Sequence, residues 1–295
     1  MTAQSAARSF RVGLIQMRSG RKPTANLDAA VKLIGEAKGN RADYVQTPEM
    51  TNILEVKRES LFAEIVPEDN DNSLSAFREL ARKLNLWIHI GSLAIKISPD
   101  KAANRAFLID PDGAIVARYD KIHMFDVDLP NGESYRESRS YAAGESAVIA
   151  DLPWGRLGIT ICYDVRFPAL HRALAEAGAI FLASPAAFTK QTGEAHWHTL
   201  LRARAIENGC FVFAAAQGGV HENGRHTYGH SLVIDPWGEV LAEAGTEPGV
   251  SLADVDVGAV AAARSKIPSL QHGRRFEILK PVDVPAHLHV VGGPT

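Results

Sequence analysis

The pattern of apolar and polar positions along the chain begins with a strand, a helix and a second strand. Apolar residues alternate over 11–16, recur at helical spacing over 26–37, and form the short run 44–46. A further amphipathic helix is predicted over 72–84, and an apolar strand over 86–93. This alternation of the two element types predicts an α/β protein.

Two similar turn sequences lie in the two halves of the chain. The segment IDPDGAIVA at 109–117 is echoed by IDPWGEVLA at 234–242, and each has apolar runs on both sides of its turn. Such turns connect the strands of β-hairpins. Since each half also carries a strand–helix–strand segment, we predict two sheets packed face to face with helices outside. This is a four-layer α-β-β-α sandwich in a single domain, and two unrelated hairpins with the same turn composition are the alternative.

The two ends of the chain differ from the middle. We expect residues 1–9 to form a flexible N-terminal segment, residues 10–280 one folded domain, and residues 281–295 an extended tail containing proline and glycine. The stretch before Asp28 has serines and arginines but no acidic residue, which is typical of a transit peptide. The strand pattern from Arg11 outweighs that likeness and leaves only the first nine residues outside the fold.

Composition and charge exclude several classes of function. The 295 residues are 46% hydrophobic and 22% charged, as in ordinary globular proteins. The net charge of −2 gives no electrostatic case for binding nucleic acid or an anionic membrane surface. The sequence contains no apolar run long enough to cross a bilayer.

The chain has two cysteines, Cys162 and Cys210, and neither belongs to a CxxC pair or lies near histidines at metal-ligand spacing. This usage favours a reducing compartment, so we expect a cytoplasmic location and no metal site. Cys210 begins the apolar run CFVFAAA and is interpreted as a core residue.

Cys162 lies where an apolar strand pattern changes into a charged turn, in the segment GITICYDVRFP. The alternation of Leu157, Ile159 and Ile161 predicts a buried strand that ends at Cys162, and a helical pattern begins at Phe167. A thiol on such a turn lies near backbone N–H groups and the positive end of a helix, which lower its pKa. We therefore interpret Cys162 as a nucleophile. A buried cysteine that acts only as a small apolar side chain is the alternative.

Charged residues elsewhere supply what a thiol nucleophile needs: a base, a cation for the developing oxyanion and a proton for the leaving group. Glu49 follows the second strand, Lys121 follows the first hairpin, and Glu137 lies in the segment YRESRSY. Glu49, Lys121 and Cys162 each lie just beyond the end of a strand, where α/β sheets gather their site residues. Taken singly, each charged residue is as well explained by a surface, capping or ion-pairing role.

Six segments in a fixed order carry a resemblance to a known family. They are TPEM at 47–50, YDKIHMFDVD at 119–128, YRES at 135–138, ICYDVRFP at 161–168, AHWHTLLRARAIENGCF at 195–211 and YGHSLVIDPWGEV at 228–240. As an ordered set they resemble the nitrilase superfamily of carbon–nitrogen hydrolases from about Arg11 to Phe276. The family pattern usually has Leu where this chain has Thr47, a departure expected to alter packing or a hydrogen bond beneath Glu49.

The resemblance implies a role for each candidate residue. In this family the glutamate that matches Glu49 is the general base, the lysine that matches Lys121 stabilises the tetrahedral intermediate, and the cysteine that matches Cys162 is the nucleophile. A second glutamate, here Glu137, has a supporting or proton-shuttling role. The backbone N–H of Tyr163 is expected to hold the oxyanion together with Lys121.

The resemblance also bears on cofactors and partners. It implies that neither a metal nor an organic cofactor takes part. It further implies a homodimer, since the family pairs its subunits into an eight-layered assembly. We expect the pairing face to include the helix around 170–175, with the tail from Pro281 reaching across the partner.

The expected reaction is hydrolysis of the amide of a small carboxylate-bearing substrate to an acid and ammonia through a thioester. Arg166, four residues past the nucleophile, is expected to bind the substrate carboxylate by paired hydrogen bonds, with a capping role for the next helix as the alternative. The segments AHW at 195–197 and AAAQGGVHENGRHTYGHS at 214–231 resemble most the deaminated glutathione amidases. Omega-amidases acting on 2-oxoglutaramate or 2-oxosuccinamate are close alternatives, and N-carbamoyl amino acid hydrolases and aliphatic amidases are more distant ones.

Two functions of another class stay open from the sequence. A redox-sensing thiol protein would use Cys162, but it would not need Glu49 and Lys121, and the chain offers no obvious resolving cysteine. A non-catalytic interaction module is expected to have lost at least one of these three residues, and all three are present.

Overall fold

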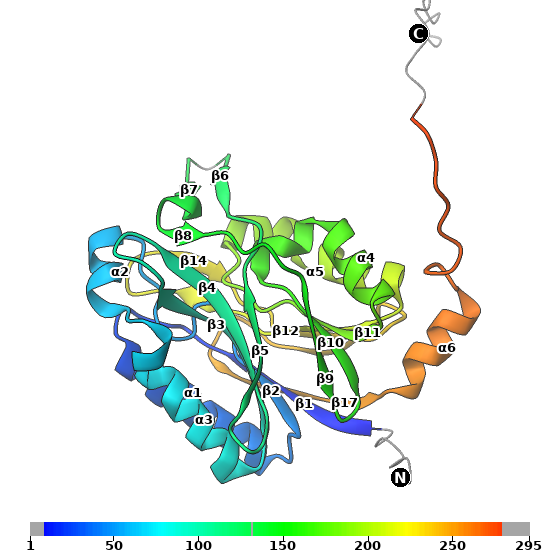
Figure 1. The fold of residues 1–295 in the computed structure, drawn as a ribbon, viewed down its shortest axis with the longest axis horizontal. Coiled ribbons are helices and arrows are strands. Elements are labelled where there is room, and N and C mark those ends of the chain that lie inside the picture. The colour runs from blue at the N-terminus through cyan, green and yellow to red at the C-terminus, as the bar shows by residue number, and fades with distance from the viewer. Residues whose placement is uncertain (1–8, 131, 279–295) are drawn as a thin grey trace, which may run out of the picture.

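Two β-sheets form the centre of the molecule in the computed structural model, which describes residues 9–130 and 132–278 (Figure 1). The first sheet has the strand order β17-β1-β2-β3-β4-β5, and β8 pairs with β4. Its strands are β1 (Ser9–Gln16), β2 (Tyr44–Gln46), β3 (Trp87–Lys96), β4 (Ala102–Ile109), β5 (Ile115–Asp120), β8 (Tyr141–Ala142) and β17 (Gly249–Asp256). The central strands β1, β2 and β3 run parallel, whereas β17, β4 and β5 pair antiparallel with their neighbours along this order.

The second sheet repeats this design with the order β16-β15-β12-β11-β10-β9. Its strands are β9 (Val148–Leu152), β10 (Gly155–Ile159), β11 (Ala179–Ala183), β12 (Phe211–Ala214), β15 (Leu232–Ile234) and β16 (Val240–Glu243). Here β10, β11 and β12 are the parallel strands, and the flanking strands are antiparallel. The two halves of the chain therefore build sheets of the same kind.

Helices cover the outer face of each sheet (Figure 1). The helices α1 (Pro23–Gly39) and α3 (Asn72–Leu84) pack on the first sheet, and α4 (Pro168–Glu176) and α5 (Lys190–Asn208) pack on the second. The predicted four-layer α-β-β-α sandwich in a single domain is confirmed. The smaller elements are α2 (Arg58–Glu64), α6 (Gly258–Lys266), η1 (Glu68–Asn70), η2 (Glu137–Arg139), η3 (Cys162–Arg166), and the two-stranded pairs β6 (Asp126–Asp128) with β7 (Ser134–Arg136) and β13 (Gly218–Val220) with β14 (His226–Tyr228). None of the helices in the described ranges is both long enough and apolar enough to cross a membrane.

Aromatic side chains fill the space between the two sheets. Phe10 lies on β1, and Phe181 and Phe213 lie on β11 and β12. The ring centroids of Phe10 and Phe181 are 5.3 Å apart, and those of Phe181 and Phe213 are 5.5 Å apart. Tyr44 on β2 joins them at 5.7 Å from Phe213. Burial of each such ring stabilises the fold by about 1.5–3 kcal/mol, so this cluster holds the two sheets together.

The two repeated turns have the same hydrogen bonds, which confirms both predicted hairpins. In each turn the aspartate side chain accepts from the N–H groups two and four positions on, at 3.0 and 2.8 Å for Asp110 and at 2.9 and 2.8 Å for Asp235. The turn glycines Gly113 and Gly238 have φ of +74° and +88°, which glycine adopts without steric cost.

The strand β10 and the helix α5 show where the structure differs from the sequence prediction. The strand β10 ends at Ile159 rather than at Cys162, because the Ile161 N–H donates to the Asp164 carboxylate at 2.8 Å instead of to a neighbouring strand. The helix α5 is not predicted by the apolar pattern. It buries polar residues such as Arg204 and Asn208 on the same face as its apolar side chains, which obscures the helical periodicity.

The predicted boundaries at the chain ends are described only in part. Ser9, placed by the sequence in the flexible segment, already pairs with Asp256 in β1. Residues 1–8 and 279–295 lie outside the described residues, so the flexible start and the tail from 281 stay predictions. After a turn at 269–272, the described chain runs away from the sandwich in an extended form (Figure 1).

The strand β3 passes so close to the turn after β2 that only glycine fits at position 91. A Cβ atom on Gly91 would lie 2.1 Å from the carbonyl oxygen of Thr47 and 2.6 Å from that of Pro48. The Gly91 N–H also donates to Thr47 Oγ1 at 3.1 Å. This contact positions the turn that leads to Glu49.

Gly91→Ala should therefore displace the turn before Glu49 and lower the free energy of unfolding by roughly 1–3 kcal/mol, the usual cost of overpacking, as measured by urea denaturation. Gly35 on α1 provides the matched control, since nothing lies within 4 Å of a Cβ atom there. Gly35→Ala should raise the free energy of unfolding by up to about 1 kcal/mol. Equal effects of the two substitutions would contradict the close approach at Gly91.

Candidate active site

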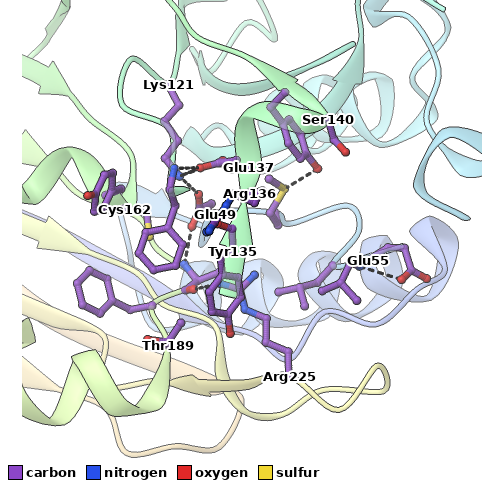
Figure 2. Close-up of a pocket in the computed structure, with 18 of the residues that line it drawn as sticks. Glu49, Glu55, Lys121, Tyr135, Arg136, Glu137, Ser140, Cys162, Thr189 and Arg225 are labelled. Atoms are coloured by element: carbon purple, nitrogen blue, oxygen red, sulfur yellow. Dashed lines mark hydrogen bonds and ion pairs between the residues drawn. The ribbon is translucent and has the colours of Figure 1, made fainter. Parts of the chain in front are cut away.

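Residues from separate strand ends meet in one cavity with a volume of about 440 Å³ (Figure 2). Glu49 follows β2, Lys121 follows β5 and Cys162 follows β10, while Glu137 begins η2. All four line the cavity, so the structure brings together the catalytic residues expected from the sequence. Glu49 follows a parallel strand of the first sheet, and Cys162 follows a parallel strand of the second. In each sheet the carboxyl ends of the parallel strands form one edge, and the two residues meet there.

Lys121 is enclosed by two carboxylates. Its Nζ donates to Glu49 Oε1 at 2.9 Å, and to Glu137 Oε1 at 3.0 Å and Oε2 at 2.8 Å. Lys121 is only 2% exposed, so little water screens these charges. Burial by itself would lower the pKa of Lys121, but the charges of Glu137 and Glu49 raise it well above its ordinary value. Lys121 is therefore a fixed positive charge at neutral pH.

The Glu49 carboxylate is set up to act as a base. Burial favours its protonated form, but the charge of Lys121 and the hydrogen bonds around the carboxylate outweigh burial and lower the pKa of Glu49. Its Oε2 accepts from the Ala187 N–H at 2.7 Å, and the Cys162 thiol lies within hydrogen-bonding range. A general base must be unprotonated and within reach of the proton that it accepts, and Glu49 meets both conditions.

Asn104 on β4 joins the two carboxylates and is absent from the sequence prediction. Its Nδ2 donates to Glu49 Oε1 at 2.8 Å and to Glu137 Oε1 at 3.0 Å, and the residue is fully buried. The signal available in the sequence is one polar residue near the start of the apolar strand AANRAFLI. The hairpin brings it beside the lysine, because the Lys121 N–H donates to the Asn104 carbonyl at 3.0 Å.

Cys162 has a left-handed backbone conformation, with φ of +49°. Such a conformation costs a residue other than glycine about 1–2 kcal/mol and recurs at functional sites. Burial and the charge of Glu49 raise the pKa of the thiol well above its ordinary value, and Lys121 opposes them only in part. The expectation of a lowered thiol pKa is therefore wrong. The thiol is neutral at rest, so a reaction through its thiolate needs a base to remove the proton.

Asp164 connects the turn of the nucleophile to the strand that leads to the lysine. Its Oδ2 accepts from the Ile161 N–H at 2.8 Å and from the Tyr119 hydroxyl at 2.6 Å. Ile161 adjoins Cys162, and Tyr119 lies two residues before Lys121. One buried carboxylate thus fixes the nucleophile relative to the cation.

The turn that carries Glu49 is held from the second half of the chain by Gln217. Its Nε2 donates to the carbonyls of Glu49 at 3.0 Å and Met50 at 3.2 Å, and Met50 has φ of +57°. Thr47 is buried beneath this turn, and its Oγ1 accepts from the Thr51 hydroxyl at 2.7 Å. Where the family usually has Leu, Thr47 thus adds a hydrogen bond close to Glu49.

The two residues expected to bind the substrate are placed differently. Tyr163 lines the cavity, whereas Arg166 is not among the described residues that line it. The Arg166 guanidinium lies 5.3 Å from the ring centroid of Phe188 and 5.9 Å from that of Tyr163, two rings of the cavity wall. Its Nη atoms are 3.3 Å from His196 Nδ1. Its role as a carboxylate ligand stays a prediction.

Two further arginines line the cavity and were not expected from the sequence. Arg136 forms a two-pronged pair with Asp128, with both contacts at 2.8 Å. Arg225 precedes β14, and its Nη2 donates to the Ala187 carbonyl at 2.6 Å. No local pattern in the sequence singles out Arg225, because its place at the cavity depends on how the β13–β14 loop folds back.

One group of metal-ligating side chains lies outside the cavity. The donor atoms of His198, His230 and Glu243 are within 4.8 Å of one another, and no other such group of three occurs in the described ranges. Glu243 Oε1 lies 3.0 Å from His198 Nε2 and 2.9 Å from His230 Nδ1, so the three side chains are joined to each other by hydrogen bonds. None of these three residues lines the cavity that holds Glu49, Lys121 and Cys162.

A family model described as carbon–nitrogen hydrolase matches residues 11–265. The chain belongs to this family. It is 40% identical over 278 residues to a deaminated glutathione amidase of Yersinia enterocolitica, a match that covers 93% of this chain and 96% of that protein. It is 36% identical over 267 residues to the omega-amidase NIT2 of Homo sapiens, covering 90% and 95% of the two chains. The family predicted from the motifs is confirmed, and the protein is an amidase of the nitrilase superfamily.

Solved structures agree with this assignment. The NitFhit protein of Caenorhabditis elegans superposes with a TM-score of 0.85 at 38% identity, over 91% of this chain and 66% of that longer one. A variant amidase from Nesterenkonia sp. AN1, with a TM-score of 0.77 and 26% identity over 93% and 97% of the two chains, carries the acetamide moiety of fluoroacetamide on its active site cysteine. The carbon–nitrogen hydrolase family thus places amidase chemistry on the fold described above.

Lys121→Met should destabilise the protein by roughly 3–5 kcal/mol at neutral pH, the cost of leaving buried charges without their partner. The pKa of Glu49 is lowered in the folded state, so its contribution to stability is complete above its ordinary pKa of 4.5 and is lost as the pH falls through the lower folded value. Without the lysine, the Glu49 carboxylate loses the charge that lowers its pKa and takes up a proton at a higher pH. The deficit relative to wild type should therefore shrink as the pH falls from about 7 to about 5.

Urea denaturation at both pH values measures this deficit. Lys22→Met is the control, since it removes a surface ion pair with Glu64 and should cost less than about 1 kcal/mol at either pH. A deficit for Lys121→Met that did not change with pH would contradict the coupling between the lysine and the two carboxylates.

Proposed function

We propose that this amidase uses Cys162 as nucleophile, Glu49 as general base and Lys121 as the cation that stabilises the oxyanion. Glu137 holds Lys121 in place. The observation that carries the proposal is that the thiol, the carboxylate and the ammonium line one cavity, with the carboxylate and the ammonium joined by a hydrogen bond. Their resting charges suit the reaction, because the base is unprotonated, the cation is fixed and the thiol keeps the proton that the leaving group will need.

In the first half of the reaction, Glu49 accepts the thiol proton as Cys162 Sγ bonds to the amide carbonyl carbon. The carbonyl oxygen becomes an oxyanion, which Lys121 Nζ and the Tyr163 N–H stabilise. Tyr163 lies in the first turn of η3, where N–H groups have no partner within the helix. As the C–N bond breaks, Glu49 gives its proton to the leaving amine. A single oxyanion donor contributes about 3–4 kcal/mol to lowering the barrier.

In the second half, the acyl group is held on Cys162 as a thioester. Glu49, again unprotonated, takes a proton from water, whose oxygen attacks the thioester carbonyl carbon. Lys121 Nζ and the Tyr163 N–H also stabilise the oxyanion that forms in this step. The C–S bond then breaks, the thiolate regains the proton from Glu49, and the acid leaves.

The leaving group separates the two nearest substrate classes. In deaminated glutathione, the substrate named for the Yersinia relative, the amide joins a 2-oxo acid to a dipeptide, so the leaving amine carries a carboxylate of its own. A primary amide such as 2-oxoglutaramate releases ammonia. A cavity of about 440 Å³ is within the range of pockets that enclose whole small-molecule ligands, which favours the larger substrate. We therefore propose deaminated glutathione first and omega-amides second, with N-carbamoyl amino acids as the more distant class.

The positions of the two cysteines argue against a redox-sensing role. Cys162 follows the carboxyl end of β10, whereas Cys210 precedes the amino end of β12, and these strands are parallel members of one sheet. The two thiols thus lie toward opposite ends of the second sheet and are both free. Burial raises the pKa of Cys210 to about 11, which makes it a poor resolving thiol.

Free thiols also bear on location. An oxidised Cys162 could not act as a nucleophile, and reducing conditions keep thiols free. We therefore propose that the protein works in the cytoplasm.

A homodimer is the proposed assembly. Apolar side chains are exposed on the second half of the chain, namely Ile206 at 50%, Trp237 at 56% and Ile267 at 58%. In the extended segment that follows α6, Phe276 and Ile278 are 84% and 86% exposed. Exposed apolar groups of this size favour a partner that covers them, and a second copy of the chain supplies one.

Cys162→Ala should abolish hydrolysis without loss of fold, whereas Cys210→Ala should keep most of the activity. Mass spectrometry of the amine or ammonia released from deaminated glutathione, 2-oxo amides, carbamoyl amino acids and nitriles measures turnover, and circular dichroism reports the fold. Turnover by Cys162→Ala at the wild-type rate, or an equal loss in both variants, would refute the nucleophile.

Light scattering at micromolar concentration should show the full chain as a dimer. A variant that ends at His272 lacks the exposed Phe276 and Ile278 and should shift toward monomer. A full-length chain that is entirely monomeric would contradict the proposed assembly.

A further inference from the structure

Arg225 differs from the other cations that line the cavity in having no ion pair with any residue of the described ranges. Three cationic side chains line the cavity: Lys121, Arg136 and Arg225. Lys121 is held by two carboxylates and Arg136 by Asp128. In the described part of the chain, Arg225 bonds only to uncharged groups and forms no ion pair. Among the residues that the structure describes, the cavity therefore contains one guanidinium group that has no ion-pair partner.

The Arg225 side chain is held in a defined position despite this lack of a partner. Its Nη2 donates to the Ala187 carbonyl at 2.6 Å, and its guanidinium carbon lies 5.3 Å from the ring centroid of Tyr135 (Figure 2). Its Nε is enclosed and has no acceptor among the described residues. A buried donor without an acceptor is unfavourable for folding, so packing alone does not explain an arginine here. A planar guanidinium held by a ring and one hydrogen bond is preorganised to receive a carboxylate.

Ala187 connects Arg225 to Glu49, the residue that gives its proton to the leaving amine in the proposed mechanism. The Ala187 N–H donates to Glu49 Oε2 at 2.7 Å, and the carbonyl of the same residue accepts from Arg225. Glu49 passes its proton to the leaving amine, so that amine lies beside Glu49 at the moment of bond cleavage. Arg166, in contrast, lies on the short helix of the nucleophile and against the ring of Tyr163.

We propose that Arg225 forms an anion-binding subsite for the leaving group, which takes the carboxylate of an amino acid or short peptide released as the amine. The preferred substrates are then secondary amides that carry a carboxylate on the amine side, rather than primary amides that release ammonia. This inference rests on the proposed amidase function and names the part of the substrate that the cavity recognises. It also leaves Arg166 as the candidate for the carboxylate of the acyl part.

Three amides with the same acyl group test the subsite. They are deaminated glutathione, its C-terminal carboxamide, which lacks only the charge on the amine side, and 2-oxoglutaramate, which lacks the amine-side group altogether. Arg225→Gln should lower kcat/KM for deaminated glutathione by about ten- to a hundredfold, mainly through KM, because it removes a hydrogen-bonded charge pair. For the other two amides the change should stay below about threefold. Arg225→Lys keeps the charge without the paired geometry and should give an intermediate loss on deaminated glutathione alone.

Arg136→Gln is the matched control, since it removes another cavity-lining arginine whose charge is already paired with Asp128. It should not discriminate between deaminated glutathione and its carboxamide. Equal losses of Arg225→Gln on all three amides would overturn the subsite, because they would show that Arg225 acts only by holding Ala187 and Glu49.

Measurements of substrate binding, which do not require turnover, test the Arg225 subsite separately from the proposed function. In the Cys162→Ala background, calorimetry should show that Arg225→Gln weakens deaminated glutathione about tenfold or more but leaves its carboxamide unchanged. Selective binding of this kind without turnover of any amide by the wild type would refute the proposed function while supporting the subsite. Turnover with no binding difference between the acid and its carboxamide would overturn the subsite alone.

Discussion

The contact on which the site depends is the ammonium of Lys121 between the carboxylates of Glu49 and Glu137. A buried carboxylate without a partner takes up a proton and ceases to be a base, and a buried lysine without a partner loses one. Each group keeps its charge because the other is present. These charges are therefore tolerated in the interior only if three parts of the chain converge, namely the turn after β2, the end of β5 and the start of η2.

The remaining polar contacts position this charge cluster relative to the thiol. Asn104 holds the two carboxylates together, Gln217 fixes the backbone at Glu49 from the second half of the chain, and Asp164 connects the nucleophile turn with Tyr119. All are buried side chains whose hydrogen bonds cross between elements that are distant in the sequence. They explain how a strained turn at the nucleophile persists: the surrounding bonds determine its conformation from several sides.

The sequence predicted those elements whose structure depends on residues close together in the chain. The helix over 72–84, the strand at 44–46 and both Asp-Pro-X-Gly hairpins depend on near neighbours, and the ordered motifs located Glu49, Lys121, Glu137 and Cys162. What escaped prediction depends on partners elsewhere in the chain. The protonation of Cys162 follows from burial and from the charge of a glutamate of the other half. The face of α5 is obscured by its buried polar residues. Asn104 and Arg225 acquire their positions only when the chain folds back.

The site residues are divided between the two sheets, so the site is incomplete until the chain has folded. The proposed base and cation come from the first half and the proposed nucleophile from the second, so neither half alone contains all three groups. A partly synthesised or partly unfolded chain carries an ordinary cysteine with no base beside it. The proposed base lies beside the thiol only when the two sheets have docked. The proposed base-assisted chemistry of Cys162 is thus confined to the folded state, in which the cavity selects what reaches the thiol.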